Sequence, residues 1–163
     1  YEIGWRWRGM LRLLPGRKGY RAPWDEWTKD FVYPENACDG ALVKDCDFSG
    51  DSAAYAKALR RWEVVVEGAK ARDSDEEFLN LWKPEYYLER YGTKEAYARH
   101  ESAFSTYAFI SADGEWHAQG RMGWFGFDDA TKESMAAHEQ AFEAYLEEAK
   151  RQGLMIVIVD CHI

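Results

Sequence analysis

Alternating apolar and polar residues predict β-strands near both ends of the chain. Residues 5–14 repeat with the period of two that is typical of a half-buried strand. The apolar face holds Trp5, Trp7, Leu11 and Leu13, and the opposite face holds Arg6, Arg8 and Arg12. After Pro15-Gly16 the chain is expected to return as a second strand at 18–21. A short strand is expected at 41–43, and residues 154–159, apolar on both faces, predict a central strand.

Apolar residues spaced three and four positions apart predict the helices. The first helix is expected to begin after an N-cap at Asp51 or Ser52 and to carry its apolar stripe to Ala69. An acidic turn at 73–77 follows it. Further helices are expected at 78–91, interrupted before Pro84, at 93–100, and at 131–152, where Gly153 ends the last one.

A β-hairpin is predicted in the second half of the chain. Residues 104–112 are rich in strand-forming side chains, and Asp113-Gly114 suits a two-residue hairpin turn. In that register Ile110 pairs with His117. The order of strands and helices favours an α+β fold, a mainly antiparallel β-sheet with helices packed on one side.

The size of the chain suits a single α+β domain over residues 1–163. Its aromatic fraction of 16%, with eight Trp, leaves aromatic side chains for an interface or a pocket. The first residue is Tyr, inside an expected strand, so we expect that an N-terminal segment is missing.

The composition predicts a protein of a reducing compartment, without membrane insertion. The longest apolar run, residues 154–159, is far shorter than the roughly 20 residues of a spanning helix. Three cysteines without a C-x-x-C pair argue against a disulfide framework. We therefore expect a cytoplasmic location.

Charge is spread unevenly along the chain, whose formal net charge is −8. Residues 1–21 hold six Lys and Arg against one Glu, or +5, so residues 22–163 carry −13. This acidity disfavours direct nucleic-acid binding, because phosphate contacts need Lys and Arg. It would suit a nucleic-acid mimic, although acidic surfaces more commonly serve only to keep a protein in solution.

Two predicted strand ends each carry a carboxylate and an imidazole two residues apart. Glu115 and His117 share one face of the first, and Asp160 and His162 share one face of the second. If the two ends are neighbours, the cluster could bind a divalent metal through His117, His162 and Asp160, or act as an acid–base pair. The alternative is a hairpin edge and a polar tail with ordinary hydrogen bonds.

Two further segments are candidates for ligand binding. The glycine-spaced loop 120–126 carries aromatic side chains that could stack on a flat ligand or plug the core. The row formed by Arg6, Arg8 and Arg12 could hold an anion. Pairing of these arginines with acidic residues of the same chain is the simpler interpretation. The candidate ligand-binding residues are Arg6, Trp7, Lys44, Asp45, Glu115, Trp116, His117, Met122, Trp124, Asp160 and His162.

Five blocks of this sequence resemble a family of uncharacterised proteins encoded by bacteriophages and prophages. They lie at residues 4–9, 41–45, 113–117, 120–126 and 158–163, and read GWRWRG, ALVKD, DGEWH, GRMGWFG and IVDCHI. Trp5 stands where the family has a second glycine, and the family usually has a further N-terminal region. Because the family has no assigned activity, the resemblance implies a setting, the cytoplasm of a bacterium carrying a phage, and no mechanism.

Two functional hypotheses follow. The first is a phage accessory protein that binds a host bacterial protein, for example as an inhibitor of a host defence system. The second is a small-ligand or nucleotide-binding protein, or a metal-assisted hydrolase, that uses Glu115, His117, Asp160 and His162. A third interpretation gives the blocks a purely structural role.

Overall fold

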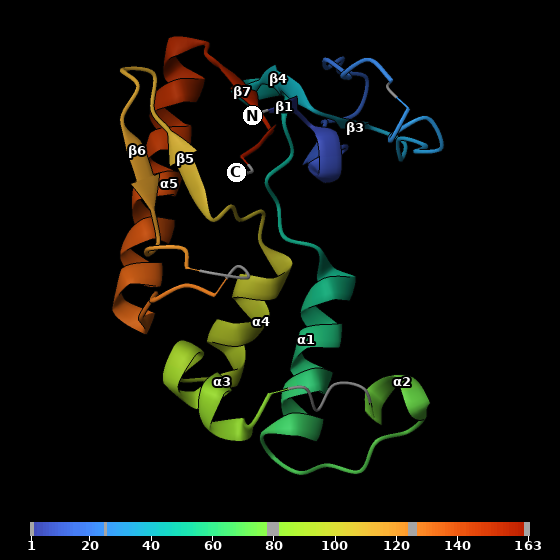
Figure 1. The fold of residues 1–163 in the computed structure, drawn as a ribbon, viewed down its shortest axis with the longest axis vertical. Helices are drawn as coiled ribbons and strands as arrows, with labels where there is room; N and C mark the ends of the chain where they lie inside the picture. Colours follow the sequence, from blue (N-terminus) through green and yellow to red (C-terminus); the bar gives the residue numbers. More distant parts are fainter. Residues whose placement is uncertain (1, 25, 78–81, 124–126, 162–163) are drawn as a thin grey trace. The chain divides into compact units, whose positions relative to one another are not determined.

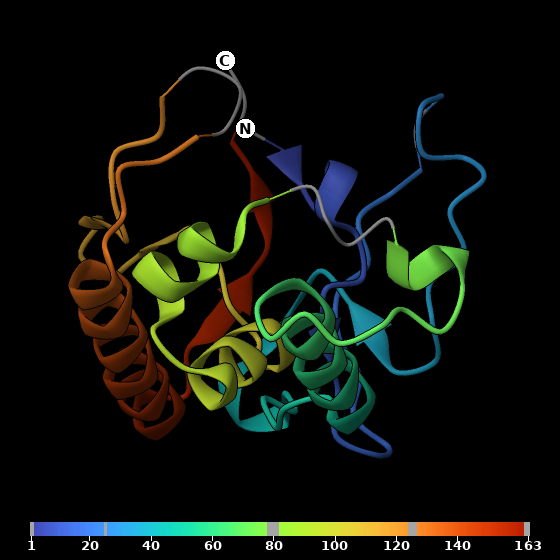
Figure 2. The same cartoon turned by 90° about the horizontal axis from the view of Figure 1, so that it is seen from below.

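The computed structural model describes residues 2–24, 26–77, 82–123 and 127–161 (Figures 1 and 2). Its strands are β1 (Glu2–Ile3), β2 (Leu11–Arg12), β3 (Ala37–Cys38), β4 (Gly40–Leu42), β5 (Ala108–Ile110), β6 (Trp116–Ala118), β7 (Met155–Val157) and β8 (Val159–Asp160). Its helices are α1 (Ser52–Val65), α2 (Ser74–Glu77), α3 (Pro84–Tyr91), α4 (Lys94–Ser102) and α5 (Lys132–Gln152), with 3₁₀ turns η1 (Trp5–Trp7) and η2 (Val43–Asp45).

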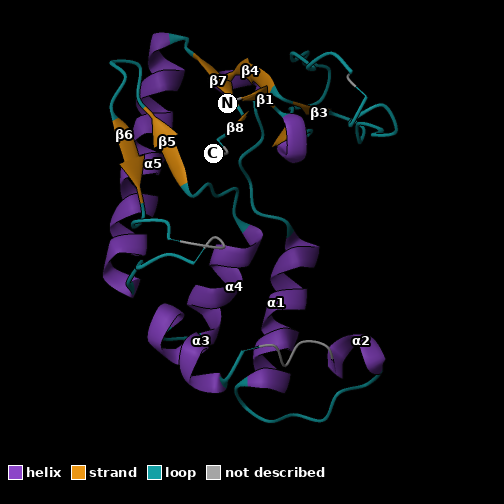
Figure 3. Ribbon diagram, viewed as in Figure 1, coloured by secondary structure: helices purple, strands orange, loops and turns teal. Residues whose placement is uncertain are grey.

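The fold is α+β with antiparallel strand pairing, as the order of elements predicts (Figure 3). The chain divides into two compact units: unit 1 is residues 1–48 and 143–163, and unit 2 is residues 49–142. α5 contributes its residues up to Phe142 to unit 2 and the rest to unit 1. The expectation of a single domain stays a prediction. Among the described helices, none combines the length and the apolar character that crossing a membrane requires.

Unit 1 contains three two-stranded sheets among its described residues. β1 pairs with β8, β2 with β3, and β4 with β7, all antiparallel. The central strand expected at 154–159 is therefore wrong: the segment divides into β7 and β8, each with one partner. Ile158 separates them, because its N–H donates to the Asp39 carbonyl and its own carbonyl accepts from the Gly4 N–H. Met155 of β7 is 59% exposed, which a central strand would not allow.

The strand predicted for residues 5–14 is only partly correct. Gly4 and Trp5 have φ values of +72° and +33°, which lie outside the extended region. The chain therefore makes the turn η1 at this point, closed by a 2.7 Å hydrogen bond from the Trp7 N–H to the Gly4 carbonyl. Leu11 is fully buried, as the alternation predicts, but Arg8 is buried too. The arginines consequently do not form one solvated face.

Asp39 joins several segments of unit 1 through its buried side chain. Its oxygens accept hydrogen bonds from the Gly9 N–H and the Ala22 N–H, both at 2.8 Å, and from the Tyr33 hydroxyl. Burying a carboxylate is costly unless its oxygens are hydrogen-bonded. These three donors therefore fix where residues 9, 22 and 33 lie.

The backbone of Asp39 binds two more segments. Its N–H donates to the Tyr20 carbonyl at 2.8 Å, and its carbonyl accepts from the Ile158 N–H at 2.8 Å. Residues 18–21, expected as a second strand, contribute only the isolated bridge between Tyr20 and Gly40.

The longer helices of unit 2 lie in the predicted segments, but α1 ends at Val65 and does not reach Ala69, and the acidic turn expected at 73–77 is the short helix α2. α1 and α4 lie side by side (Figures 1 and 2). Asp51 caps α1 by accepting from two backbone N–H groups, and Thr93 caps α4 by accepting from one. α3 begins at Pro84, and Gly153 follows α5 with a φ of +70°. The buried core consists of Ala58, Trp62, Val65, Tyr87, Tyr97 and Ala98.

The hairpin of β5 and β6 is present, but its predicted register is wrong by one residue. Phe109, not Ile110, lies opposite His117. The loop has three residues because Ser111 closes it twice: its carbonyl accepts from the Gly114 N–H, and its N–H donates to the Glu115 carbonyl. Gly114, with a φ of +90°, fills the left-handed position that such a loop requires.

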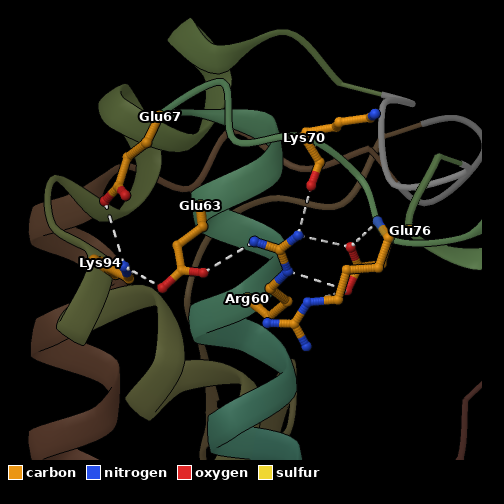
Figure 4. Close-up of polar contacts among 7 residues, drawn as sticks. Arg60, Glu63, Glu67, Lys70, Glu76 and Lys94 are labelled. Atoms are coloured by element: carbon orange, nitrogen blue, oxygen red, sulfur yellow. Dashed lines mark hydrogen bonds and ion pairs between the residues drawn. The ribbon is translucent and has the colours of Figure 1, made fainter.

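A network of ion pairs links α1, α2 and α4 (Figure 4). Arg60 of α1 donates to both oxygens of Glu76 in α2, at 3.0 and 2.8 Å. Glu63, one turn along α1, accepts from Arg60 at 3.1 Å and from Lys94 of α4 at 2.9 Å. Lys94 also lies 3.5 Å from Glu67. The network therefore ties the segment that follows α1 back onto that helix.

We expect acidification to release α2 from Arg60. The hydrogen bond from Arg60, followed by that from the Arg72 N–H, lowers the pKa of Glu76 to about 2. A carboxylate with a depressed pKa stabilises the fold above its unfolded value, and that contribution is lost as the pH falls from about 4.5 towards about 2. Carbon-detected NMR titration of the carboxyl groups measures this directly. A Glu76 titration near the ordinary value would contradict the network; Glu76→Gln should remove the low transition, and Glu67→Gln should leave it.

Asp39→Asn should destabilise unit 1. An amide oxygen cannot replace two carboxylate oxygens, and its NH₂ group would face a backbone donor at Gly9 or Ala22. An unsatisfied buried donor costs roughly 1–3 kcal/mol. Urea unfolding measures the loss, and hydrogen exchange at those two amides shows whether it is local. The matched control is Asp30→Asn at an exposed position; equal stability of the two variants would contradict a central role for Asp39.

Candidate functional site

A surface hollow of about 330 Å³ lies in unit 1. It is lined by Trp5, Arg6, Arg8, Trp27, Thr28 and Phe31. These residues come from η1 with the residue that follows it, and from the irregular segment before β3. Three aromatic residues and two arginines therefore meet there, and none of the described lining residues carries a carboxylate. Such a lining suits a ligand or partner that combines negative charge with an apolar group.

Arg6 is held in place from two sides. Its Nε and Nη2 both donate to the carboxylate of Asp160 at 2.6 Å, and its guanidinium lies 5.0 Å from the centre of the Trp5 ring. Asp160 is almost fully buried, whereas the Arg6 side chain is 52% exposed. The hydrogen bond to Asp160 is the main cause of the raised pKa of Arg6. A buried carboxylate thus orients an arginine that still reaches solvent.

Trp5 enters the hollow from an unusual backbone conformation. Its φ of +33° is rare for a residue with a side chain, and strained residues of this kind persist where the surrounding structure over-determines them. Gly4 precedes it at +72°, and a Cβ there would lie 2.9 Å from Cγ of Asp39. Gly4 therefore allows the chain to pass against the buried carboxylate before it turns into the hollow.

Arg8 also lines the hollow and is held by hydrogen bonds. Its guanidinium donates to the carbonyl oxygens of Ala22 and Pro23, each at 2.8 Å, and lies 5.6 Å from the Trp24 ring. Tyr33 also receives a hydrogen bond from Arg8, at 3.3 Å. Burial, followed by the hydrogen bond to Asp39, raises the pKa of Tyr33, so its hydroxyl keeps its proton. The loop that carries Trp27 is consequently anchored by polar contacts at its start.

The same segment exposes large apolar side chains. Trp27 is 85% exposed and Val32 is 83% exposed, and Trp24 is about half exposed. Trp24 also contacts Phe31, with ring centres 6.5 Å apart. We call these residues, together with those that line the hollow, the Trp27 surface.

The structure places the predicted ligand-binding residues of the first third of the chain in different surroundings. Arg6 lines the hollow, as just described. Trp7 is half exposed and does not line it. Lys44 and Asp45 form part of η2, where Lys44 is exposed and Asp45 lies 3.4 Å from Nε of Arg17. The sequence did not single out Trp27, Thr28 or Phe31; the density of aromatic residues in that irregular segment was the signal.

The predicted metal cluster draws on both units. Glu115 and His117 belong to unit 2 and Asp160 to unit 1, while His162 lies outside the described residues. Asp160 directs its oxygens to Arg6. Within the described ranges there is no group of three or more His, Cys, Asp or Glu side chains suited to a metal ion. A divalent metal at His117, His162 and Asp160 stays a prediction.

His117 packs on the hairpin. Its ring stacks on Phe109 with centres 4.6 Å apart, and its Nε2 lies 3.2 Å from the Ser111 hydroxyl. Phe109 in turn contacts His138 and Phe142 of α5. These contacts give His117 a structural role within unit 2.

The remaining candidates lie on or near the hairpin. Glu115, Trp116 and Met122 are exposed. Gly120 allows a close approach, because a Cβ there would lie 2.8 Å from the Ala130 backbone nitrogen. Trp124 lies outside the described residues, so whether the 120–126 loop binds a ligand stays a prediction.

Comparisons with known proteins give no relatives for this chain: no family model matches it, and neither does any curated protein or solved structure.

We expect stability to fall as the pH drops below about 6.5, with His138 as one cause. Burial lowers the pKa of His138, whose Nε2 lies 3.2 Å from the Thr106 carbonyl oxygen. Below the unfolded pKa the unfolded chain takes up a proton that the folded histidine does not, so acid favours unfolding. Urea unfolding between pH 8 and pH 5.5 measures the effect. His138→Gln should reduce the pH dependence, and an unchanged slope in this variant would refute this account.

Proposed function

We propose that this protein acts by binding another protein through the Trp27 surface. The observation that carries the proposal is the 85% exposure of Trp27 beside a hollow that Arg6 enters in a fixed orientation. Tryptophan and arginine are the side chains most enriched among residues that dominate binding energy at protein interfaces. A large indole left in water gains most when a partner covers it.

In the setting that the resemblance to phage and prophage proteins implies, the partner is a host bacterial protein. An inhibitor of a host defence system is the most specific form of this proposal. The acidic balance of the chain supports a protein partner over nucleic acid, because a net charge of −8 repels phosphate backbones.

A metal-assisted hydrolase has less support from the side-chain contacts. Of its four residues, Asp160 is bound by Arg6 and His117 packs against Phe109. A small-ligand function at the hollow itself is a second candidate, because the two arginines and the aromatic rings would also suit an anionic aromatic compound.

Trp27→Ala should weaken partner binding without unfolding the protein, because Trp27 is 85% exposed. Tagged wild-type protein and the variant are incubated with host lysate, and quantitative mass spectrometry identifies proteins whose recovery depends on Trp27. Each such protein is then purified and its affinity measured directly. We expect at least about tenfold weaker binding by Trp27→Ala, the effect typical of a dominant interface tryptophan.

The matched control for this experiment is Trp116→Ala. Trp116 is another exposed tryptophan, but it lies in β6 of unit 2. Partner recovery should survive this change. A partner lost equally from both variants, or no direct binding partner that depends on Trp27, would refute the proposal.

A further inference from the structure

We propose that the Trp27 surface receives an acidic segment of its partner, with a carboxylate of that segment bound beside Arg6 and neighbouring apolar side chains covering Trp27 and Phe31. This inference rests on the proposed function and names the chemistry of the partner. Its grounds are the charge of the lining, the orientation of Arg6 and the extent of the apolar surface around the hollow.

The hollow presents two arginines in a chain whose net charge is −8. Arg6 and Arg8 both line it, and none of the described lining residues is Asp or Glu. Three of the six described lining residues belong to residues 1–21, which carry +5. The two arginines therefore favour an acidic group of the partner at the hollow.

Arg6 has the geometry of a prepared carboxylate binder. Asp160 occupies its Nε and Nη2, and the described residues provide no hydrogen-bond acceptor for its Nη1. Arginine is a planar fork of five N–H donors, so one buried carboxylate can fix the group while the outer N–H groups remain able to bind a second. Trp5 stacks near the same guanidinium and limits its movement further. Less side-chain freedom is then lost when a ligand binds.

The extent of the exposed apolar surface favours a polypeptide over a small anion. The hollow holds about 330 Å³, which is near the lower limit for a small-molecule site. A compound that filled it would leave Val32, which does not line the hollow, 83% exposed. A peptide segment can place one acidic side chain in the hollow and continue across Trp24 and Val32.

The test uses synthetic peptides and the tryptophan indole signals in proton–nitrogen NMR spectra. The probe is an acetylated, amidated pentapeptide that alternates Asp or Glu with Phe. The comparison ligands are the same peptide with Asn and Gln in place of the acids, inorganic phosphate, and ATP. We expect saturable shifts with the acidic peptide and binding at least about tenfold weaker with the neutral one, since one charge-assisted contact is lost. Binding of the acidic peptide should weaken as salt is raised.

Three variants locate the site. Trp27→Ala should weaken the acidic peptide about tenfold or more. Arg6→Gln alone would leave Asp160 buried without its ion pair, so the double variant Arg6→Gln with Asp160→Asn keeps a neutral pair and should also weaken binding. Arg12→Gln removes an exposed charge of β2, which does not line the hollow, and should leave affinity nearly unchanged.

Equal affinity for the acidic and neutral peptides would overturn the inference. An affinity for the acidic peptide that neither Trp27→Ala nor the double variant changes would also overturn it. Saturation by phosphate or ATP at lower concentration than the peptide would assign the hollow to a small anion instead. If a host protein binds through Trp27 but is indifferent to Arg6 and to salt, the proposed function stands and the acidic segment is wrong. If no protein binds through Trp27, both are wrong.

Discussion

The segments at the centre of unit 1 depend on the burial of the Asp39 carboxylate. Asp39 has no contact with solvent, so its oxygens must find donors within the chain, and they find them at Gly9, Ala22 and Tyr33. These donors come from segments without regular secondary structure, which could not hold their positions through backbone ladders alone. The short strands of unit 1 contribute less, because each pairs only two or three residues with a partner. The segments between them are brought together by the Asp39 carboxylate, which accepts hydrogen bonds from all three.

Unit 2 is stabilised in another way. Its core consists of aromatic rings on α1, α3 and α4, with Tyr87 meeting Trp62 and Tyr97 edge to face. Such pairs contribute beyond the apolar area that they bury. Burial also raises the pKa of Tyr97 to about 12, so its hydroxyl remains neutral among these rings. Beside this core, Arg60 and Lys94 join the helices through ion pairs. One unit is therefore organised around a buried charge and the other around buried rings.

This difference explains how much the sequence could reveal. Helices of unit 2 were predictable because their periodicity, caps and terminators are local, as at Asp51 and Pro84. The hairpin was predictable in kind but not in register, because the Asp-Gly pair suits both a two-residue turn and the last positions of a three-residue loop. Unit 1 was less predictable. No local pattern shows that the chain turns at Gly4 and Trp5. Nor does one show that Gly4 packs against the buried carboxylate of Asp39, thirty-five residues further along the chain.

The candidate site shows the same limit. The sequence favoured pairing of Arg6 with acidic residues of the same chain, and it does pair with one. Its partner Asp160 was not foreseen, because Asp160 was assigned to a possible metal cluster. A spacing rule can place two residues on one face of a strand, as it did for Glu115 and His117. It cannot show that a ring stacks on Phe109 or that a carboxylate is already occupied. The density of aromatic residues around Trp27 was visible in the sequence, but the exposure of Trp27 was not, because exposure is a property of the folded chain.

The division into units also has a consequence for synthesis. Unit 2 is one continuous stretch, so every contact within it can form once residue 142 has left the ribosome. Unit 1 combines residues 1–48 with residues 143–163. β4 therefore cannot pair until β7 has been synthesised, and β1 cannot pair until β8 has been synthesised. Pairings this distant along the chain are slow to form. β1 and β4 therefore stay unpaired while unit 2 is being made. Arg6, which lines the hollow beside Trp27, meets Asp160 only after residue 160 has been synthesised.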